Sequence, residues 1–179
     1  MTNRIIPTAI INPDAPPESL EAKQPAIDNG AEIYGKTGYF SHEQVEQEWQ
    51  KIWTESWLIA GVSTDLTDVG DYFLFRVRSE SLIITKTAEG IKAFYNVCPH
   101  RGARLITEER GNKKVFVCPF HSWSFHNNGE LRSITDEDSF QEAVVCHRPG
   151  LTSVACEEHA GLIFVSMADQ PPVLADVIG

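Results

Sequence analysis

Two short segments near the middle of the chain each carry one cysteine and one histidine, and they limit the possible folds more than any other feature. The first segment runs from Cys98 to His100, and the second runs from Cys118 to His121. Seventeen residues separate His100 from Cys118, which is enough for a hairpin that brings the segments face to face. We therefore expect a fold in which two tight loops present two thiols and two imidazoles at one place.

Two thiolates and two imidazoles suit either of two metal groups. In one type of [2Fe–2S] cluster, two Cys bind one iron and two His bind the other. Zn²⁺ also accepts two Cys and two His, but classical zinc fingers pair Cys with Cys and His with His along the chain. Here each segment supplies one of each, and the prolines Pro99 and Pro119 stiffen the loops because proline fixes φ. The pattern favours the iron–sulfur cluster, with zinc as the alternative.

The composition disfavours several classes of partner. The chain has 179 residues, of which 42% are hydrophobic, so it can form one compact domain and a tail. Its net charge of −10, from 15 basic and 25 acidic residues, argues against nucleic acid, which needs a basic face. No apolar run approaches the roughly 18–20 residues of a membrane span. The first residues do not read as a signal peptide because Pro7 interrupts them. We expect a cytoplasmic protein with no nucleic-acid and no membrane partner.

The N-terminal part of the chain divides into an arm and a helix. Residues 1–40 contain five prolines, which is typical of an extended arm. A helix is expected over 41–56, because Ser41 and Gln44 match a capping box. Apolar residues recur in it at helical spacing, which predicts a stripe that packs in the core; they are Val45, Trp49, Ile52 and Trp53.

From residue 57 onward the pattern is typical of short strands. The Asn128-Gly129 pair is a strong hairpin signal between two of them. A short helical turn is expected over 136–141. Short strands at this spacing indicate an antiparallel sandwich or barrel. The expected strands cover residues 57–62, 72–78, 81–87, 91–97, 115–117, 123–125, 130–134, 144–148, 151–155 and 162–166.

Several longer stretches support a family resemblance; they are residues 57–61, 70–72, 93–103, 118–121, 123–125, 129–131 and 161–165. They resemble the N-terminal part of Rieske non-haem iron oxygenase α subunits, the aromatic-ring-hydroxylating dioxygenases and their monooxygenase relatives. The resemblance implies a mainly β fold, a Rieske-type antiparallel β-sandwich over residues 57–170 with two cluster-binding hairpin loops. It also implies a Rieske [2Fe–2S] cluster, held by Cys98, His100, Cys118 and His121.

Two details of the loops bear on this resemblance. Ser122 stands where the family usually has Gly, and a serine costs more than a glycine if that position needs a positive φ. Neither loop has the second Cys that forms a disulfide in Rieske proteins of respiratory cytochrome bc complexes. The resemblance therefore favours an oxygenase-type centre.

The resemblance also implies a function. In the family, the Rieske domain passes electrons from a ferredoxin or flavin reductase to a mononuclear iron in a following domain, where O₂ is activated. That iron is held by two His and a carboxylate at a spacing that none of the other histidines shows, so we expect no catalytic residue in this chain. Residues 171–179 resemble the start of a linker to such a domain. The other histidines are His42, His126, His147 and His159.

We therefore expect the electron-transfer part of an oxygenase of aromatic hydrocarbon catabolism, whose parent is a homotrimer or pairs with a β subunit. The alternative is a free-standing Rieske-type ferredoxin.

Three further residues flank the loops. Arg101 and Arg104 are candidates for docking an electron carrier or a neighbouring subunit, or are solvated charges. Trp123 is a candidate for shaping the electron's route, or packs over the loop.

Overall fold

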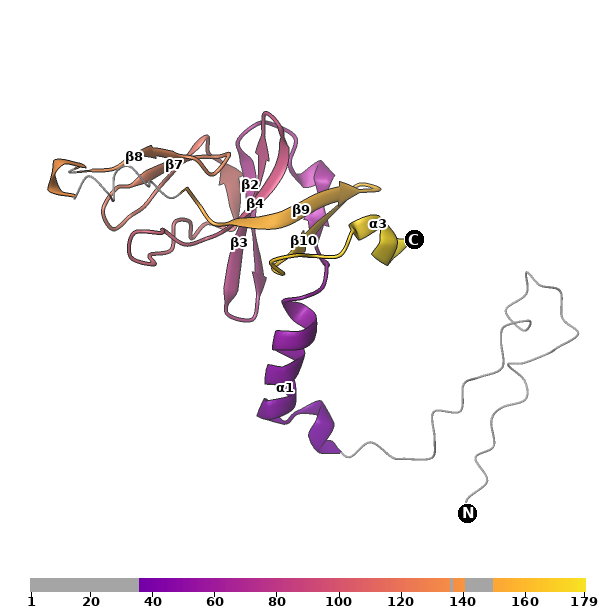
Figure 1. Ribbon diagram of the computed structural model, residues 1–179. Coiled ribbons are helices and arrows are strands. Elements are labelled where there is room, and N and C mark those ends of the chain that lie inside the picture. Colours follow the sequence, from indigo (N-terminus) through magenta and orange to yellow (C-terminus); the bar gives the residue numbers. More distant parts are fainter. Residues whose placement is uncertain (1–35, 136, 141–149) are drawn as a thin grey trace, which may run out of the picture. The chain divides into compact units, whose positions relative to one another are not determined.

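Figure 1 shows the computed structural model, which describes residues 36–135, 137–140 and 150–179. The chain forms two compact units, one ending at Val45 and the other covering Glu46–Gly179. The described part of the first unit holds a 3₁₀ helix, Lys36–Tyr39, and the start of α1, His42–Glu48. Most of the expected N-terminal arm, residues 1–35, lies outside the described residues, as does the expected strand over 144–148.

Helix α1 begins at the expected cap but does not form the expected buried stripe. The Ser41 hydroxyl accepts the backbone N–H of Gln44 at 3.1 Å. After Glu48 the helix continues as a π-helical turn, Trp49–Trp53, in which bonds span five residues and the α-helical spacing of side chains is lost. Val45, Ile52 and Trp53 are 41%, 51% and 45% exposed, so the predicted core packing of this stripe is wrong.

The second unit is mainly β, and all of the strand pairs in its described residues are antiparallel, as predicted. One sheet has seven strands in the order β1-β10-β9-β4-β3-β2-β5, and the other has three in the order β6-β7-β8. The strands are β1 (Leu58–Val62), β2 (Asp71–Val77), β3 (Glu80–Thr87), β4 (Gly90–Tyr95), β5 (Arg110–Asn112), β6 (Val115–Val117), β7 (Ser124–His126), β8 (Leu131–Ser133), β9 (Ser153–His159) and β10 (Leu162–Ser166).

Three short helices complete the described part of this unit: the 3₁₀ helices Ser63–Asp65 and Glu137–Ser139, and α3, Leu174–Ile178. The turn at Glu137–Ser139 falls within the expected helical turn. Helix α3 was not predicted, and Leu174 anchors it because this side chain is only 2% exposed. Among the described residues, no helix has both the length and the apolar character that crossing a membrane requires.

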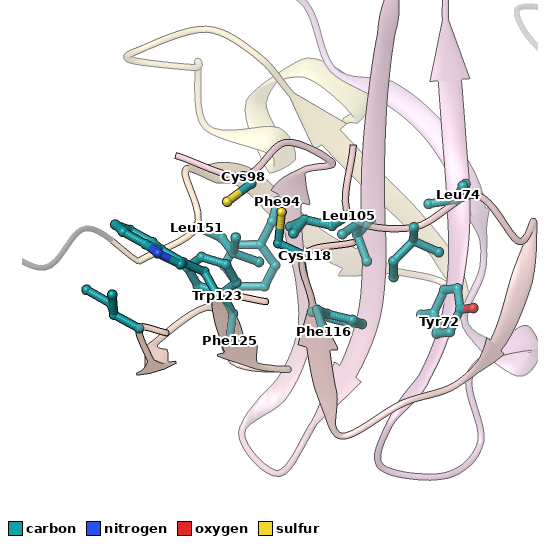
Figure 2. Packing of buried hydrophobic residues seen from close by; sticks show 13 residues of the cluster. Tyr72, Leu74, Phe94, Cys98, Leu105, Phe116, Cys118, Trp123, Phe125 and Leu151 are labelled. Atoms are coloured by element: carbon teal, nitrogen blue, oxygen red, sulfur yellow. The ribbon is translucent and has the colours of Figure 1, made fainter. Parts of the chain in front are cut away.

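Strand β3 is buried on both faces, because its side chains alternate between the two faces of the sheet and each face packs in a hydrophobic core. In β3, Ile83 belongs to one hydrophobic core and Ile84 to another, and both are fully buried. We call the core that contains Ile83 the loop-side core, because Cys98 and Cys118 also belong to it. Figure 2 shows this core, with Tyr72 at one end and Trp123 at the other. The two cysteines are therefore fixed by the packing that holds the sheets together.

The Asn-Gly hairpin between β7 and β8 forms where the sequence predicts it. Gly129 has a φ of 89° and donates its N–H to the carbonyl of His126 at 2.9 Å. A Cβ at this position would lie 2.3 Å from Cε1 of Phe94 in β4. Only glycine satisfies both the backbone angle and this close approach, so the hairpin of the small sheet is seated directly against the large one.

Candidate metal centre

The two ligand loops have the same pattern of backbone hydrogen bonds, which we call the loop frame. In loop 1 (residues 98–103) the N–H of Cys98 donates to the carbonyl of Ala103 at 2.7 Å. In loop 2 (residues 118–123) the N–H of Cys118 donates to the carbonyl of Trp123 at 2.8 Å. Each bond spans five residues and closes its loop at the base. The matching closure explains why two short segments of different sequence present their cysteines alike.

The fifth residue of each loop completes the frame. The N–H groups of Gly102 and Ser122 donate back to the carbonyls of Cys98 and Cys118 at 2.9 and 3.0 Å. Gly102 has a φ of 72° and Ser122 has a φ of 60°, so both adopt the left-handed conformation. The position of Ser122 therefore does need a positive φ, as the family's usual glycine suggested. Ser122 carries a backbone cost of about 1 kcal/mol that glycine would avoid.

The histidines occupy different places in this frame yet meet in space. His100 is the second residue after its cysteine and His121 is the third, and their ring centroids lie 4.8 Å apart with planes at 65°. Cys98 and Cys118 are 1% and 2% exposed. The Cys98 thiol interacts with the Cys118 thiol, and Figure 2 shows both side chains in the loop-side core. The structure thus brings Cys98 beside Cys118 and His100 beside His121.

The donors form two like pairs, thiol beside thiol and imidazole beside imidazole. Each pair suits one iron of a binuclear cluster. The paired arrangement is the one that the cluster interpretation requires.

The imidazoles offer free donor atoms to such a group. Within the described residues, Nδ1 of His100 and Nδ1 of His121 are buried and have no hydrogen-bond partner. An unpaired buried nitrogen costs about 1–3 kcal/mol, so two of them side by side call for a partner that satisfies both. Burial foremost, with His121 and Arg101, lowers the pKa of His100, which keeps this imidazole in the neutral form that binds metals.

The thiols are buried and partly prepared for ligation. Burial raises the pKa of Cys98, and the adjoining Cys118 raises it further. Backbone N–H groups of His100 and Arg101 bond to the Cys98 side chain and lower its pKa. Such N–H groups stabilise a thiolate once a metal has displaced the proton. The donor set therefore fits a [2Fe–2S] cluster with mixed Cys and His ligation.

Aromatic rings cover the two histidines unequally. The indole of Trp123 stacks on His100, with centroids 4.6 Å apart and planes at 5°. Phe140 meets the same imidazole edge-on at 5.6 Å. On the other side, Phe120 contacts His121 at 3.9 Å but is itself 56% exposed. The aromatic neighbours of His100 are thus Trp123 and Phe140, whereas the neighbour of His121 is a largely exposed ring.

The arginines that the sequence singled out lie at the rim. The guanidinium carbon of Arg101 is 5.2 Å from the centre of the exposed Phe120 ring. Arg104 is exposed and lines a surface depression beside loop 1, together with Glu80 and Tyr95. Both remain available for a charged partner.

The sequence pattern did not single out Asn96, whose side chain links the chain before loop 1 to the chain after it. Its side chain is 4% exposed, and its Oδ1 accepts the N–H groups of Leu105 and Ile106 at 3.1 and 2.9 Å. Its Nδ2 donates to the carbonyl of Ile106 at 2.7 Å and to the hydroxyl of Ser81 at 3.2 Å. One amide therefore ties the residues after loop 1 to those before it. The available signal was an asparagine at the end of an apolar strand, two positions before the first cysteine.

The remaining histidines lie away from the loops or outside the described residues. His126 and His159 are exposed in β7 and β9, and His42 is exposed in α1. His147 lies outside the described residues.

Comparison with known proteins agrees with this geometry. The family model for the Rieske [2Fe-2S] domain matches residues 56–158. The glycine betaine monooxygenase oxygenase subunit of Chromohalobacter salexigens is 33% identical over 73% of this chain and 29% of its own length. The large oxygenase component of the naphthalene 1,2-dioxygenase system of Pseudomonas putida is 34% identical over 82% of this chain and 32% of its own length.

A solved structure is similar over the same region. A quaternary ammonium Rieske monooxygenase superposes with a TM-score of 0.70 at 30% identity, covering 78% of this chain and 38% of that one. The fold is therefore the Rieske-type fold of oxygenase components. The chain spans about a third of the length of the curated relatives it matches.

Proposed function

Because this chain belongs to the Rieske [2Fe-2S] domain family, we propose that it holds one such cluster through Cys98, His100, Cys118 and His121 and transfers electrons within an oxygenase. One observation carries the ligand assignment. The buried Nδ1 atoms of His100 and His121 lack hydrogen-bond partners in the described part of the chain, and the two histidines lie in the same loops as two buried thiols.

Four side chains would hold the cluster, two at each iron. Once deprotonated, the Cys98 and Cys118 thiols would hold one iron, and their burial keeps water from the sulfurs. His100 and His121 would hold the other iron through Nδ1. When bound, the cluster takes up and releases one electron, at a potential that its two neutral imidazoles raise above that of an all-cysteine cluster. The loop N–H groups at Cys98 stabilise the added negative charge.

The oxygenase assignment rests on the relatives. They are oxygenase components of a betaine monooxygenase and a naphthalene dioxygenase, and this chain corresponds to about a third of each. We place the chain as the electron-transfer part of such a subunit. It would receive electrons from a ferredoxin or flavin reductase and pass them to a mononuclear iron in a catalytic domain. Aromatic compounds are one of two substrate classes that the relatives' names represent, and quaternary amines are the other.

Variants of the ligands test the assignment. His121→Cys should keep a cluster, shift its visible spectrum and lower its reduction potential, because a thiolate replaces a neutral imidazole. Cys118→Ser should lose most of the bound iron and sulfide. His126→Ala is the matched control, because His126 is exposed in β7 and lies outside both loops. An unchanged spectrum and potential in His121→Cys would remove His121 from the ligand set.

A further inference from the structure

Trp123 of loop 2 stacks on the imidazole of His100 in loop 1. The two rings lie nearly parallel, with planes at 5° and centroids 4.6 Å apart. Phe140 meets both of them edge-on at 5.6 Å. The imidazole is therefore bounded on one face by the indole and at its edge by a phenyl ring, which restricts rotation of its plane.

The indole is itself fixed in place. Trp123 is 2% exposed and belongs to the loop-side core, together with Cys118 and Phe125. Its carbonyl accepts the N–H of Cys118, so its backbone is part of the frame of loop 2. Figure 2 shows the ring at the end of this core. A residue of loop 2 thus stacks on the histidine of loop 1.

The ring face, and not a hydrogen bond, carries this contact. Nε1 of Trp123 is buried and has no hydrogen-bond partner within the described ranges. Replacing the indole with another aromatic ring would therefore break no hydrogen bond there. The opposite histidine is contacted differently: the Phe120 ring lies 3.9 Å from His121 between centroids, but it is tilted by 36° and is 56% exposed.

We propose that Trp123 is a positioning residue that fixes the plane of the His100 ring and thereby the direction from which its Nδ1 approaches the metal. Groups around a metal ligand orient that ligand and tune the metal's electronic properties. The inference rests on the proposed ligand role of His100. It assigns the two imidazoles unequal freedom, with His100 held rigidly and His121 less constrained.

The experiment compares holoprotein carrying Trp123→Leu, which removes the stacked ring, with Trp123→Phe, which keeps an aromatic face. Phe125→Leu is the matched control, because Phe125 is fully buried in the same core two residues further along. The readouts are the reduction potential and the ¹⁴N hyperfine couplings of the reduced cluster by pulsed electron paramagnetic resonance. Trp123→Met fills more of the volume without a ring, and it replaces Trp123→Leu if that variant does not retain its cluster.

We expect Trp123→Leu to shift the coupling of one nitrogen and the potential, and Trp123→Phe to restore both. Phe125→Leu should lower thermal stability while leaving both readouts at wild-type values. Wild-type spectra in Trp123→Leu or Trp123→Met, or an equal shift in Phe125→Leu, would overturn the proposal. A wild-type protein without two coupled nitrogens would instead refute the ligand assignment itself, so the two failures are distinguishable.

Discussion

Replacing Asn96 with alanine should strongly destabilise the protein. The substitution leaves three buried backbone groups unpaired: the N–H groups of Leu105 and Ile106 and the carbonyl of Ile106. Leu105 and Ile106 are 7% and 1% exposed, so water does not readily replace the amide.

The expected magnitude follows from these contacts. Each unsatisfied buried group costs about 1–3 kcal/mol, and neighbouring losses are not additive, so the total should be about 3–5 kcal/mol. For a chain of this size that corresponds to a fall in melting temperature of roughly 10 °C. Because the same amide links Leu105 and Ile106, which follow loop 1, to the end of the strand that precedes it, the variant should also lose bound iron to a chelator faster than the wild type.

The assay is thermal unfolding of anaerobically prepared protein, followed by circular dichroism, together with the rate of iron loss to a chelator. Asn112→Ala is the control, since Asn112 is exposed and bonds to Asp71 and to the carbonyl of Val69. A melting temperature within about 2 °C of this control, or wild-type iron loss, would refute the reasoning that Asn96 secures loop 1.

Three further outcomes are expected. Ser122→Gly should raise the unfolding free energy by about 0.5–1 kcal/mol, because relief of the positive φ exceeds the added entropy of the unfolded chain; denaturant titration checks this, and a loss of stability would contradict it. Gly129→Ala should cost about 3 kcal/mol in the same titration, because its Cβ would lie 2.3 Å from Phe94, and a neutral effect would show that the hairpin is not seated there. Burial, with two neighbouring carboxylates, raises the pKa of Cys156 to about 12. Iodoacetamide at pH 8 should therefore label this thiol far more slowly than a model thiol, as measured by peptide mass spectrometry. Labelling at the model rate would refute the burial of the thiol.

The parts of the fold that were predictable have strong local causes. The ligand loops follow from the spacing of Cys and His, and the Asn-Gly turn follows from the freedom of Gly129 to adopt a positive φ. The strands of the second unit other than β5 follow from runs of β-branched and aromatic residues. In each case a short stretch of chain determines the structure without help from distant residues.

The parts that were missed depend on tertiary contacts. Strand β5, Arg110–Asn112, has no apolar pattern and exists because it pairs with β2. The π-helical turn after α1 changed the spacing that the sequence pattern assumed. The sequence allowed Trp123 to pack over the loop, but it did not indicate that the indole stacks on His100 of the other loop. Contacts between loops distant in sequence carry no periodic signal.

The central claim is that these four side chains hold a binuclear iron–sulfur group. Its most direct test is the content of iron, acid-labile sulfide and zinc in protein purified without oxygen. We expect about two iron and two sulfide per chain, with little zinc. One zinc per chain with no labile sulfide would contradict it.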